Sequence, residues 1–313
     1  MYYPYLRGKQ FELLALREFA EFYSANCNIF PIIEPVKKSF NSLTTAFQKM
    51  QEKGISFSII LNPQNGELIN DYRSIETFIK NDLIDLNNCR PTFIVNNRNS
   101  RYIINKIEEL ELKNIILICQ DNVDTENPDF NYLVERAECE LILINGDNRS
   151  LRRRLNRIGK VIVRLDDKFN SQKKNSDYIN IPEERFTEEH RCYEEDGFNG
   201  FADYTVLGSD FIEGGRLPYA VAMHFTYEKN ADEIWVRHFV SDTNDDNTNI
   251  QGKFGEAAAK AVSFFRSNSI NSHAIEELTS YYTSGQYPGL GVLKKLSIKH
   301  HLELINSILS QSV

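Results

Sequence analysis

Two histidines, His224 and His238, are the residues whose type and spacing most directly suggest chemistry in this chain. They lie in two segments rich in β-branched and aromatic residues, AVAMHFTYE and EIWVRHFVS, which the polar residues KNAD separate. This pattern predicts a β-hairpin. With the turn centred on Asn230-Ala231, the two histidines face each other, their Cβ atoms roughly 5 Å apart, and could share a ligand or an ion. The alternative is two half-exposed polar residues on a sheet face.

Polar residues also stand where most of the predicted strands end. They are Glu34, Asn62, Asn96 or Asn97, Gln120 and Asp121, Asn145, Asp166 and Asp167, and Asp210. Carboxylates and amides suit hard cations and hydroxyl-rich ligands, although polar residues also cap the elements of any α/β protein. Glu34, which lies between Pro31 and Pro35, is the best single candidate among them.

These groups suggest a metal-assisted hydrolase of the phosphodiesterase type. The catalytic residues would be Glu34, Asp166, His224 and His238. Groups that bind the ligand would be Asn62, Arg164 and Arg237. A divalent metal ion is the cofactor that such a site would take, and the sequence does not identify it. The hypothesis requires that the catalytic groups converge within a few ångströms.

Several familiar catalytic motifs are absent from the sequence. There is no G-x-x-x-x-G-K-[ST] phosphate loop, no G-x-S-x-G nucleophile elbow and no H-E-x-x-H zinc helix. The pair His300-His301 is adjacent, and adjacent residues of a helix point about 100° apart, so the two cannot easily bind one metal ion.

Two basic segments are candidates for anion binding. In YPGLGVLKKLSIKHHLEL, a glycine turn begins a helix that carries Lys294 and His300, and this arrangement could bind a phosphate or carboxylate. In SLRRRLNRIGK, Leu151, Leu155 and Ile158 have helical spacing, so the arginines should lie on the solvated face of a short helix. A contact of these arginines with phosphate or an acidic partner is the alternative. For the first segment, too, the alternative is a solvated helix face.

The elements that must position these residues alternate between strand and helix. After an N-terminus that leads directly into a helix over residues 9–26, apolar strands are predicted over 28–36, 57–63, 91–97, 114–120, 140–146, 160–167 and 203–208. Strands that are apolar on both faces and separated by helices indicate a parallel sheet with both faces covered. With an eighth strand over 219–227, the count favours an α/β fold of the (β/α)₈ TIM-barrel type over a doubly wound open sheet.

The rest of the chain is predicted to decorate one barrel-like domain over 1–313. Residues 168–199 are polar and acidic, which indicates an insertion or long loop over one mouth of the barrel. The β-hairpin is a further insertion, and helices within 253–313 should pack on the barrel.

Composition narrows the classes of partner and location. The net charge of −8 disfavours broad binding to nucleic acid. The sequence contains no run of 18 or more apolar residues, so no membrane span is predicted. Five scattered cysteines without a C-x-x-C pair are typical of reduced thiols in a cytoplasmic protein. The sequence is compatible with both a monomer and an oligomer.

Several longer motifs carry a resemblance. They are MYYPYLRGKQFELLAL, PIIEPVKK, ILNPQNGEL, GG-x-x-PYAVAMHFTY…HFVSD, KFGEAAAK and YPGLGVLKKLSIKHHLEL. Together, over nearly the whole chain, they resemble a prokaryotic family of unassigned activity that is related to the phage-type "beta protein" family. The resemblance implies a soluble bacterial protein, often on mobile elements and encoded beside a smaller partner gene. It implies no catalytic mechanism, and this chain has Cys119 or Gln120 where the family leads us to expect histidine.

Three hypotheses follow. The first is a component of a bacterial two-gene defence module, anti-phage or toxin-antitoxin-like, which recognises a protein partner from the adjacent gene. It would also recognise a phosphate-bearing ligand through the barrel mouth and hairpin. The second is the metal-assisted hydrolase with its site at the C-terminal ends of the barrel strands. The third is a scaffold whose polar strand ends are only caps.

Overall fold

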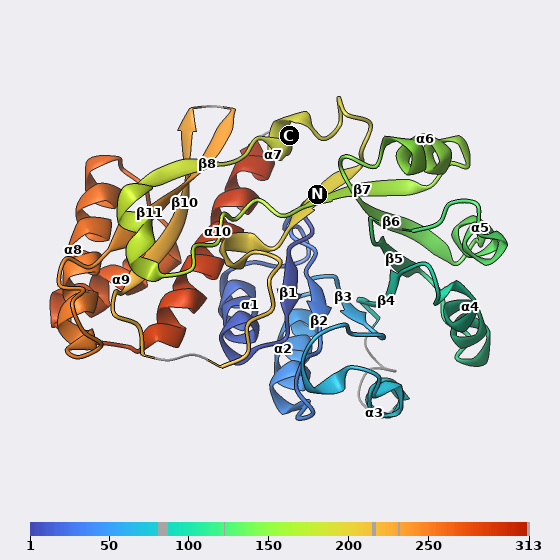
Figure 1. Ribbon diagram of the computed structural model, residues 1–313, viewed down its shortest axis with the longest axis horizontal. Helices are drawn as coiled ribbons and strands as arrows, with labels where there is room; N and C mark the ends of the chain where they lie inside the picture. The colour runs from blue at the N-terminus through green and yellow to red at the C-terminus, as the bar shows by residue number, and fades with distance from the viewer. Residues whose placement is uncertain (81–86, 122, 215–216, 231, 312–313) are drawn as a thin grey trace.

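The computed structural model describes residues 1–80, 87–121, 123–214, 217–230 and 232–311 (Figure 1). Within these ranges the chain contains an eight-stranded parallel sheet, which confirms the predicted (β/α)₈ barrel-like α/β fold. In spatial order its strands are β1 (Tyr5–Arg7), β2 (Ile32–Glu34), β3 (Phe57–Ile60), β4 (Cys89–Val95), β5 (Ile115–Cys119), β6 (Cys139–Asn145), β7 (Val161–Asp166) and β9 (Gly200–Asp203).

The two edges of this sheet meet at Tyr2, which bridges to Ile29 on one side and to Phe201 on the other. The sheet is therefore a nearly closed barrel. Alternate strand residues point inward and form an apolar interior that includes Ile32 and Leu143. The other strand residues pack outward against helices, as the apolar runs predicted. Because the strands are parallel, their C-terminal ends all open at the same mouth.

Helices follow most of the barrel strands and cover the outside of the barrel. They are α1 (Gln10–Phe22), α2 (Asn41–Glu52), α3 (Tyr72–Phe78), α4 (Ser100–Glu109), α5 (Pro128–Glu135) and α6 (Arg149–Arg157). Between the strands predicted over 57–63 and 91–97 the sequence predicts a helix over 71–85, of which residues 81–85 lie outside the described residues. Short 3-10 turns, η1 (Gly66–Leu68) and η4 (Thr205–Leu207), follow β3 and β9.

The predicted eighth barrel strand over 219–227 was wrong. This segment contains β10 (Ala222–Asn230), which pairs with β11 (Glu233–Val240) in a separate antiparallel sheet, and His224 lies directly opposite His238 as predicted. The eighth barrel strand is instead β1, a three-residue strand before α1, where the sequence predicts no strand. Such a short strand shows no periodicity, and only its pairing with β2 identifies it.

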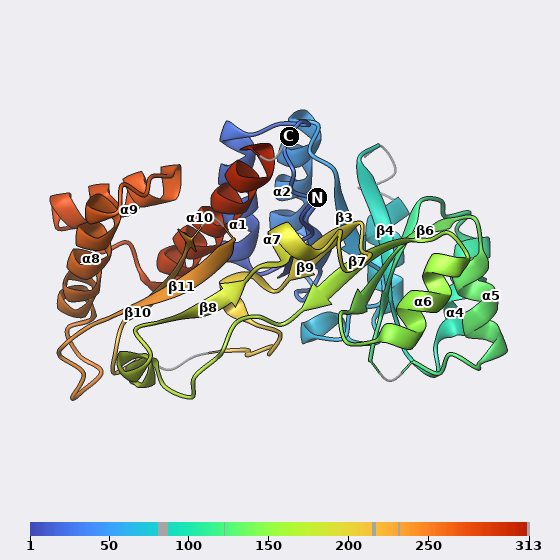
Figure 2. The same cartoon turned by 90° about the horizontal axis from the view of Figure 1, so that it is seen from above.

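The segment 168–199 contributes the third strand of the antiparallel sheet. It contains η3 (Asn175–Asn180), β8 (Glu183–Thr187) and α7 (Glu189–Cys192), and β8 pairs with β11. Helices α8 (Ile250–Ser267) and α9 (His273–Ser284) cover the far side of this sheet (Figure 2). The hairpin is therefore the centre of a second layer beside the barrel.

Helix α10 (Leu290–Gln311) joins the two parts, because it packs against α1 of the barrel and against β10 of the second sheet (Figures 1 and 2). A Cβ atom at Gly291 would overlap the ring of Phe11 on α1, so this glycine permits close packing of the two helices. No helix in the described part of the chain is long and apolar enough to cross a membrane.

Candidate functional site

A cavity of about 490 Å³ opens at the C-terminal mouth of the barrel. Its floor is formed by the apolar side chains of Ile94, Ile118 and Leu165 together with the rings of Tyr5 and Tyr204. Its polar wall is formed by Arg7, Gln64, Asn65, Gln120, Asp121, Asn145, Asp167 and Ser209. An apolar floor with a polar rim is the usual composition of a small-molecule site, and the mouth is where TIM barrels carry such sites.

The two tyrosines form an aromatic platform in the floor. Their ring centroids are 4.9 Å apart, and the guanidinium of Arg7 lies 5.2 Å from the ring centroid of Tyr204. Burial raises the pKa of Tyr204 to about 12. Arg7 opposes this shift, and Asp167 and other carboxylates add to it. Its hydroxyl therefore stays protonated at neutral pH and can donate a hydrogen bond.

Arg7 and Asp167 hold the segment that crosses one side of the mouth. Arg7 donates from Nη1 to the Gly208 carbonyl at 2.9 Å and from Nη2 to the Ser209 carbonyl. Asp167 accepts from the Ser209 amide at 2.9 Å. Arg7 is 5% exposed, and no carboxylate among the described residues forms an ion pair with its guanidinium. Its Nε has no hydrogen-bond partner there either.

Glu34, the best candidate from the sequence, lies at the end of β2 just below the rim and is fully buried. Its Oε1 accepts from the amides of Gln64 and Asn65 at 2.6 and 3.0 Å, and its Oε2 accepts from the Tyr5 hydroxyl at 2.9 Å. The Asn65 side chain donates to both oxygens. Because the protein itself supplies these donors, Glu34 positions rim residues instead of facing the ligand.

Asn62 also has a structural environment. Its side chain accepts from the Ile94 amide and donates to the Ile94 carbonyl, both at 2.8 Å, and so extends the pairing of β3 with β4. The next residues of the same loop, Gln64 and Asn65, are the ones that line the cavity. Gly66 allows this turn, since its φ is +77° and a Cβ atom there would overlap the Val36 carbonyl.

Asp121 is the least satisfied carboxylate of the mouth. Among the described residues, its carboxylate accepts a single long hydrogen bond, from the Asn145 side chain at 3.5 Å. The neighbouring Gln120 is exposed, and its side chain makes no hydrogen bond with any described residue. The β5 and β6 ends of the mouth therefore present carbonyl, carboxylate and amide groups that a ligand can bind.

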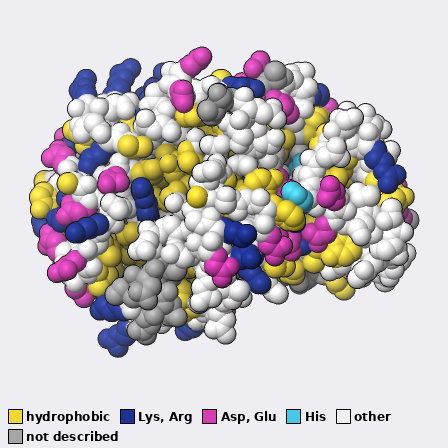
Figure 3. Space-filling view, turned by 180° about the vertical axis from the view of Figure 1, so that it is seen from behind, with side chains coloured by type: hydrophobic (Ala, Val, Ile, Leu, Met, Phe, Trp, Pro, Cys, Tyr) yellow, Lys and Arg dark blue, Asp and Glu magenta, His cyan; other side chains and the backbone are white. Residues whose placement is uncertain are grey.

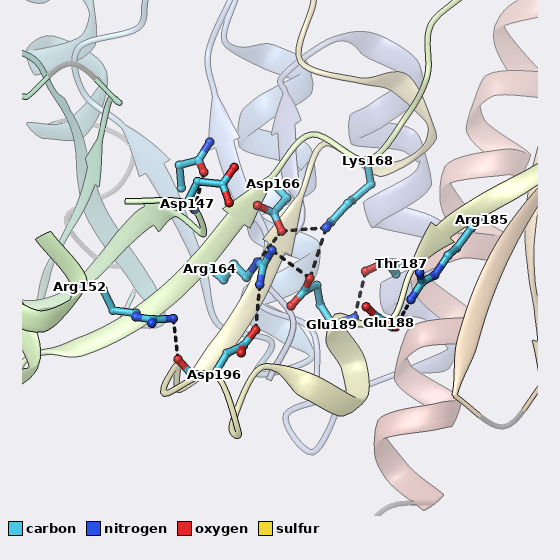
Figure 4. A network of polar contacts seen from close by, with 11 residues as sticks. Asp147, Arg152, Arg164, Asp166, Lys168, Arg185, Thr187, Glu188, Glu189 and Asp196 are labelled. Atoms are coloured by element: carbon cyan, nitrogen blue, oxygen red, sulfur yellow. Dashed lines mark hydrogen bonds and ion pairs between the residues drawn. The ribbon is translucent and has the colours of Figure 1, made fainter. Parts of the chain in front are cut away.

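Asp166 and Arg164 lie on the outer face of β7, not in the mouth (Figure 4). Arg164 contacts Asp166 at 2.6 Å, Asp196 at 3.0 Å and Glu189 at 3.3 Å. Lys168 contacts Asp166 and Glu189 at 3.0 and 3.2 Å. Because side chains alternate along a strand, the next residue, Asp167, is the one that points into the mouth. This network ties β7 to α7.

The histidine pair lies in the antiparallel sheet. The Nδ1 atoms of His224 and His238 are 2.7 Å apart, and His238 Nε2 lies 3.3 Å from Glu184. The rings of Phe169 and Tyr178 cover the pair. Burial, together with His238 and Lys294, lowers the pKa of His224 to about 3. Burial also lowers the pKa of His238, against the effect of Glu184.

The remaining predicted ligand residues are separated from the mouth as well. Arg237 lies on the far face of the hairpin and pairs with Glu183 at 2.9 Å. Lys294 is exposed on the first turn of α10. His300 is 1% exposed and contacts the Thr226 carbonyl at 2.7 Å and the Ser272 hydroxyl at 2.8 Å. The alternative of a solvated helix face was wrong for most of this segment, since Lys295, Lys299 and both histidines are buried.

The structure thus does not bring the predicted catalytic residues together. Glu34 contacts rim residues of the barrel, Asp166 contacts the outer network, and the two histidines contact each other in a different sheet. Among the described residues, no group of three His, Cys, Asp or Glu side chains is arranged to hold a metal ion.

The sequence reasoning missed the central residues of the mouth, which are Tyr5, Arg7 and Tyr204. Tyr5 and Arg7 belong to the unrecognised strand β1, and Tyr204 directly follows β9. Tyr3, Tyr5 and Arg7 of MYYPYLR are two residues apart and would share one face of a strand, but three positions are too few to predict one. Asp121 and Asn145 are among the polar strand ends of the sequence but not among the residues that it predicts to act.

Comparisons with known proteins add no relative. No model of a known protein family matches the chain, and a search of curated proteins finds no match. The fold and the mouth therefore define the class, a TIM-barrel-like α/β protein with a polar cavity at the C-terminal ends of its strands.

Proposed function

We propose that this chain is the recognition component of a bacterial two-gene defence module, and that its barrel mouth binds a small, neutral, hydroxyl-rich molecule. The observation that carries the ligand proposal is the cavity of about 490 Å³. Around its aromatic floor, Gln120 and the Tyr204 hydroxyl have no side-chain hydrogen bond among the described residues, and Asp121 has a single long one. The partner and the defence role are proposed on the resemblance of the sequence motifs. A volume of this size suits a molecule as large as a sugar or a nucleoside.

The charges of the mouth favour a neutral ligand over a phosphate. One guanidinium, that of Arg7, is accompanied by the carboxylates of Asp121 and Asp167 and by Glu34 directly below the rim. Arg7 already donates to two carbonyl groups. A phosphate would face an excess of negative charge, whereas hydroxyl groups can donate to the carboxylates and exchange hydrogen bonds with the amides.

Metal-assisted hydrolysis gains no support from the arrangement of the described residues. The histidines that would have bound the metal lie in the second sheet, and Glu34 is satisfied by amides and a tyrosine. We therefore propose binding, not catalysis, as the role of the mouth. We also propose a cytoplasmic location, because all five cysteines are free thiols, as in a reducing compartment.

Calorimetry with matched pairs of ligands tests the mouth. Neutral sugars and nucleosides, and their monophosphates, are titrated into the wild-type protein and into two variants, Asp121→Asn and Asp245→Asn. The second variant is a control, because the carboxylate of Asp245 is exposed and lies outside the mouth. We expect a neutral compound to bind, at least tenfold loss in Asp121→Asn, and no change in the control. Tighter binding of the phosphates, or equal binding by all three proteins, would contradict the proposal.

The partner proposal needs a separate test. The chain and the product of its adjacent gene are co-expressed, and the complex is measured by size-exclusion chromatography with light scattering. We expect a stable complex, and a change in the activity of the partner when this chain is present. Two separate species with unchanged partner activity would contradict a two-gene module without affecting the ligand proposal.

A further inference from the structure

Three arginines form a stripe along the outer face of α6. Arg149, Arg153 and Arg157 are all exposed and lie at positions i, i+4 and i+8, so their side chains lie on one face of the helix, one turn apart. Among the described residues, none of the three guanidinium groups has a hydrogen bond or an ion pair. Lysine and arginine side chains stand out from the end of the molecule where α6 lies, at the upper left of Figure 3.

Other residues of α6 contact the protein, which leaves the stripe facing outward. Leu151 and Leu155 are buried against the barrel. Arg152 donates to the Asp196 carbonyl at 2.8 Å, and Arg154 donates to the Thr125 carbonyl at 2.6 Å. The two kinds of arginine on this helix are therefore distinct, since one kind bonds the helix to neighbouring loops and the other makes no side-chain polar contact with the described residues.

The stripe opposes the stability of its own helix. Like charges at i, i+4 destabilise a helix by a few tenths of a kcal/mol per pair, whereas the helix dipole disfavours Arg149 in the first turn and favours Arg157 in the last. No acidic residue of α6 offsets these effects, because its sequence is RSLRRRLNR. In a chain with net charge −8, three arginines at one-turn intervals, without partners among the described residues, form a local basic surface.

We propose that the arginine stripe, Arg149, Arg153 and Arg157, is the docking surface for an acidic helical segment of a partner protein. Carboxylates at i, i+4 and i+8 on the partner would match the spacing of the arginines, and each guanidinium can hold a carboxylate with two parallel hydrogen bonds. The stripe is only about 12 Å long, given a rise of 1.5 Å per residue. This length suits two turns of a partner helix.

Nucleic acid fits this surface less well. Proteins that bind the DNA backbone tightly neutralise about 6–10 phosphates, whereas the stripe offers three cations. The exposed acidic residues Glu194, Glu195 and Asp196 lie next to α6, because Arg152 donates to Asp196 and stacks on Phe198. A long polyanion that extends along α6 would be repelled by these acidic residues. The proposal does not depend on the ligand of the barrel mouth.

Designed peptides provide the probe. Three fluorescently labelled probes are compared. They are an alanine-based helical peptide with glutamates at i, i+4 and i+8, its glutamine analogue and a 12-nucleotide oligothymidylate. Their binding to the full chain is followed by fluorescence anisotropy at low salt. We expect the glutamate peptide to bind most tightly and to weaken as salt rises, because exposed charges are screened. The stripe variant Arg149→Gln, Arg153→Gln, Arg157→Gln should lose at least about tenfold in affinity.

A matched control separates the stripe from net charge. The triple variant Arg73→Gln, Arg98→Gln, Lys113→Gln removes the same charge from exposed positions elsewhere and should change affinity less than twofold. A charge reversal of the stripe to glutamate should bind a lysine version of the peptide. Equal losses in both triple variants, tighter binding of the oligothymidylate, or no peptide binding at about 1 mM would each overturn the proposal.

Discussion

The polar residues of this protein occupy two regions that differ in where their hydrogen-bond partners come from. Beside α10, the Tyr2 hydroxyl donates to Asp203 at 2.5 Å and contacts His301 at 3.0 Å, and His301 contacts the Thr226 hydroxyl at 2.9 Å. This chain of contacts is buried and joins β9 and the N-terminus to the hairpin. Each member finds its partner in the protein.

At the barrel mouth, several polar groups find only part of their partners in the protein. Asp121 has a single long contact with Asn145, and the hydroxyl of Tyr204 makes no hydrogen bond with any described residue. Because these groups border a cavity, water or a ligand can satisfy them. The comparison teaches that histidine, the residue type that first suggests chemistry, here serves the fold, whereas tyrosine, aspartate and amide side chains form the candidate site.

The strongest test of this comparison removes a partnered histidine. We expect His301→Leu to lower the free energy of unfolding by about 3 kcal/mol, because Tyr2 and Thr226 each lose a buried hydrogen-bond partner. Urea denaturation followed by circular dichroism measures this change.

His190 provides the matched control for His301. It is also buried, but neither ring nitrogen has a hydrogen-bond partner among the described residues, and burial lowers its pKa to about 4. His190→Leu should therefore change stability by less than about 1 kcal/mol. Similar losses in both variants would show that burial of the ring, not its hydrogen bonds, makes histidine structural here.

A backbone change can disturb the mouth alone. We expect Gly66→Ala to cost about 2–3 kcal/mol and to abolish ligand binding, because its Cβ overlaps the Val36 carbonyl and must displace the loop that carries Gln64 and Asn65. Gly159→Ala has a similar positive φ of +72° but open space around it, and should cost only about 1 kcal/mol. Equal costs would mean that the loop yields freely.

Acid should weaken the hairpin through His224. Its folded pKa of about 3 lies below its unfolded value of 6.5, so the unfolded chain binds the proton first, and stability present above pH 6.5 is lost as the pH falls toward 3. Between pH 7 and pH 5 this histidine contributes a loss of about 2 kcal/mol. Urea denaturation of wild type and His224→Gln across this range isolates it; identical pH profiles would contradict a buried neutral ring.

The smallest effect on stability is expected in the mouth itself. Asp121→Asn should change the free energy of unfolding by less than about 0.5 kcal/mol, because the carboxylate is exposed and has only one long contact. Thermal denaturation measures this change. A loss above about 1 kcal/mol would place Asp121 with the structural residues and weaken the case for a ligand at the β5 end.

Local patterns of the sequence determined most of the barrel strands and helices and the pairing of the hairpin. Apolar runs separated by helices predicted a parallel barrel, and the hairpin pattern predicted that His224 faces His238, because strand and turn periodicity depend on near neighbours. The sequence likewise predicted the polar residues at the strand ends, because it shows where each apolar run stops.

Only the tertiary structure decided which polar residues form the candidate site. A shift of one residue separates Asp166, in the outer ion-pair network, from Asp167 in the mouth, and both faces of that strand are covered. Strand β1 became visible only through its pairing with β2, and α10 is buried because the barrel and the second sheet pack on it from two sides. These outcomes depend on contacts between residues far apart in the chain, which no local pattern records.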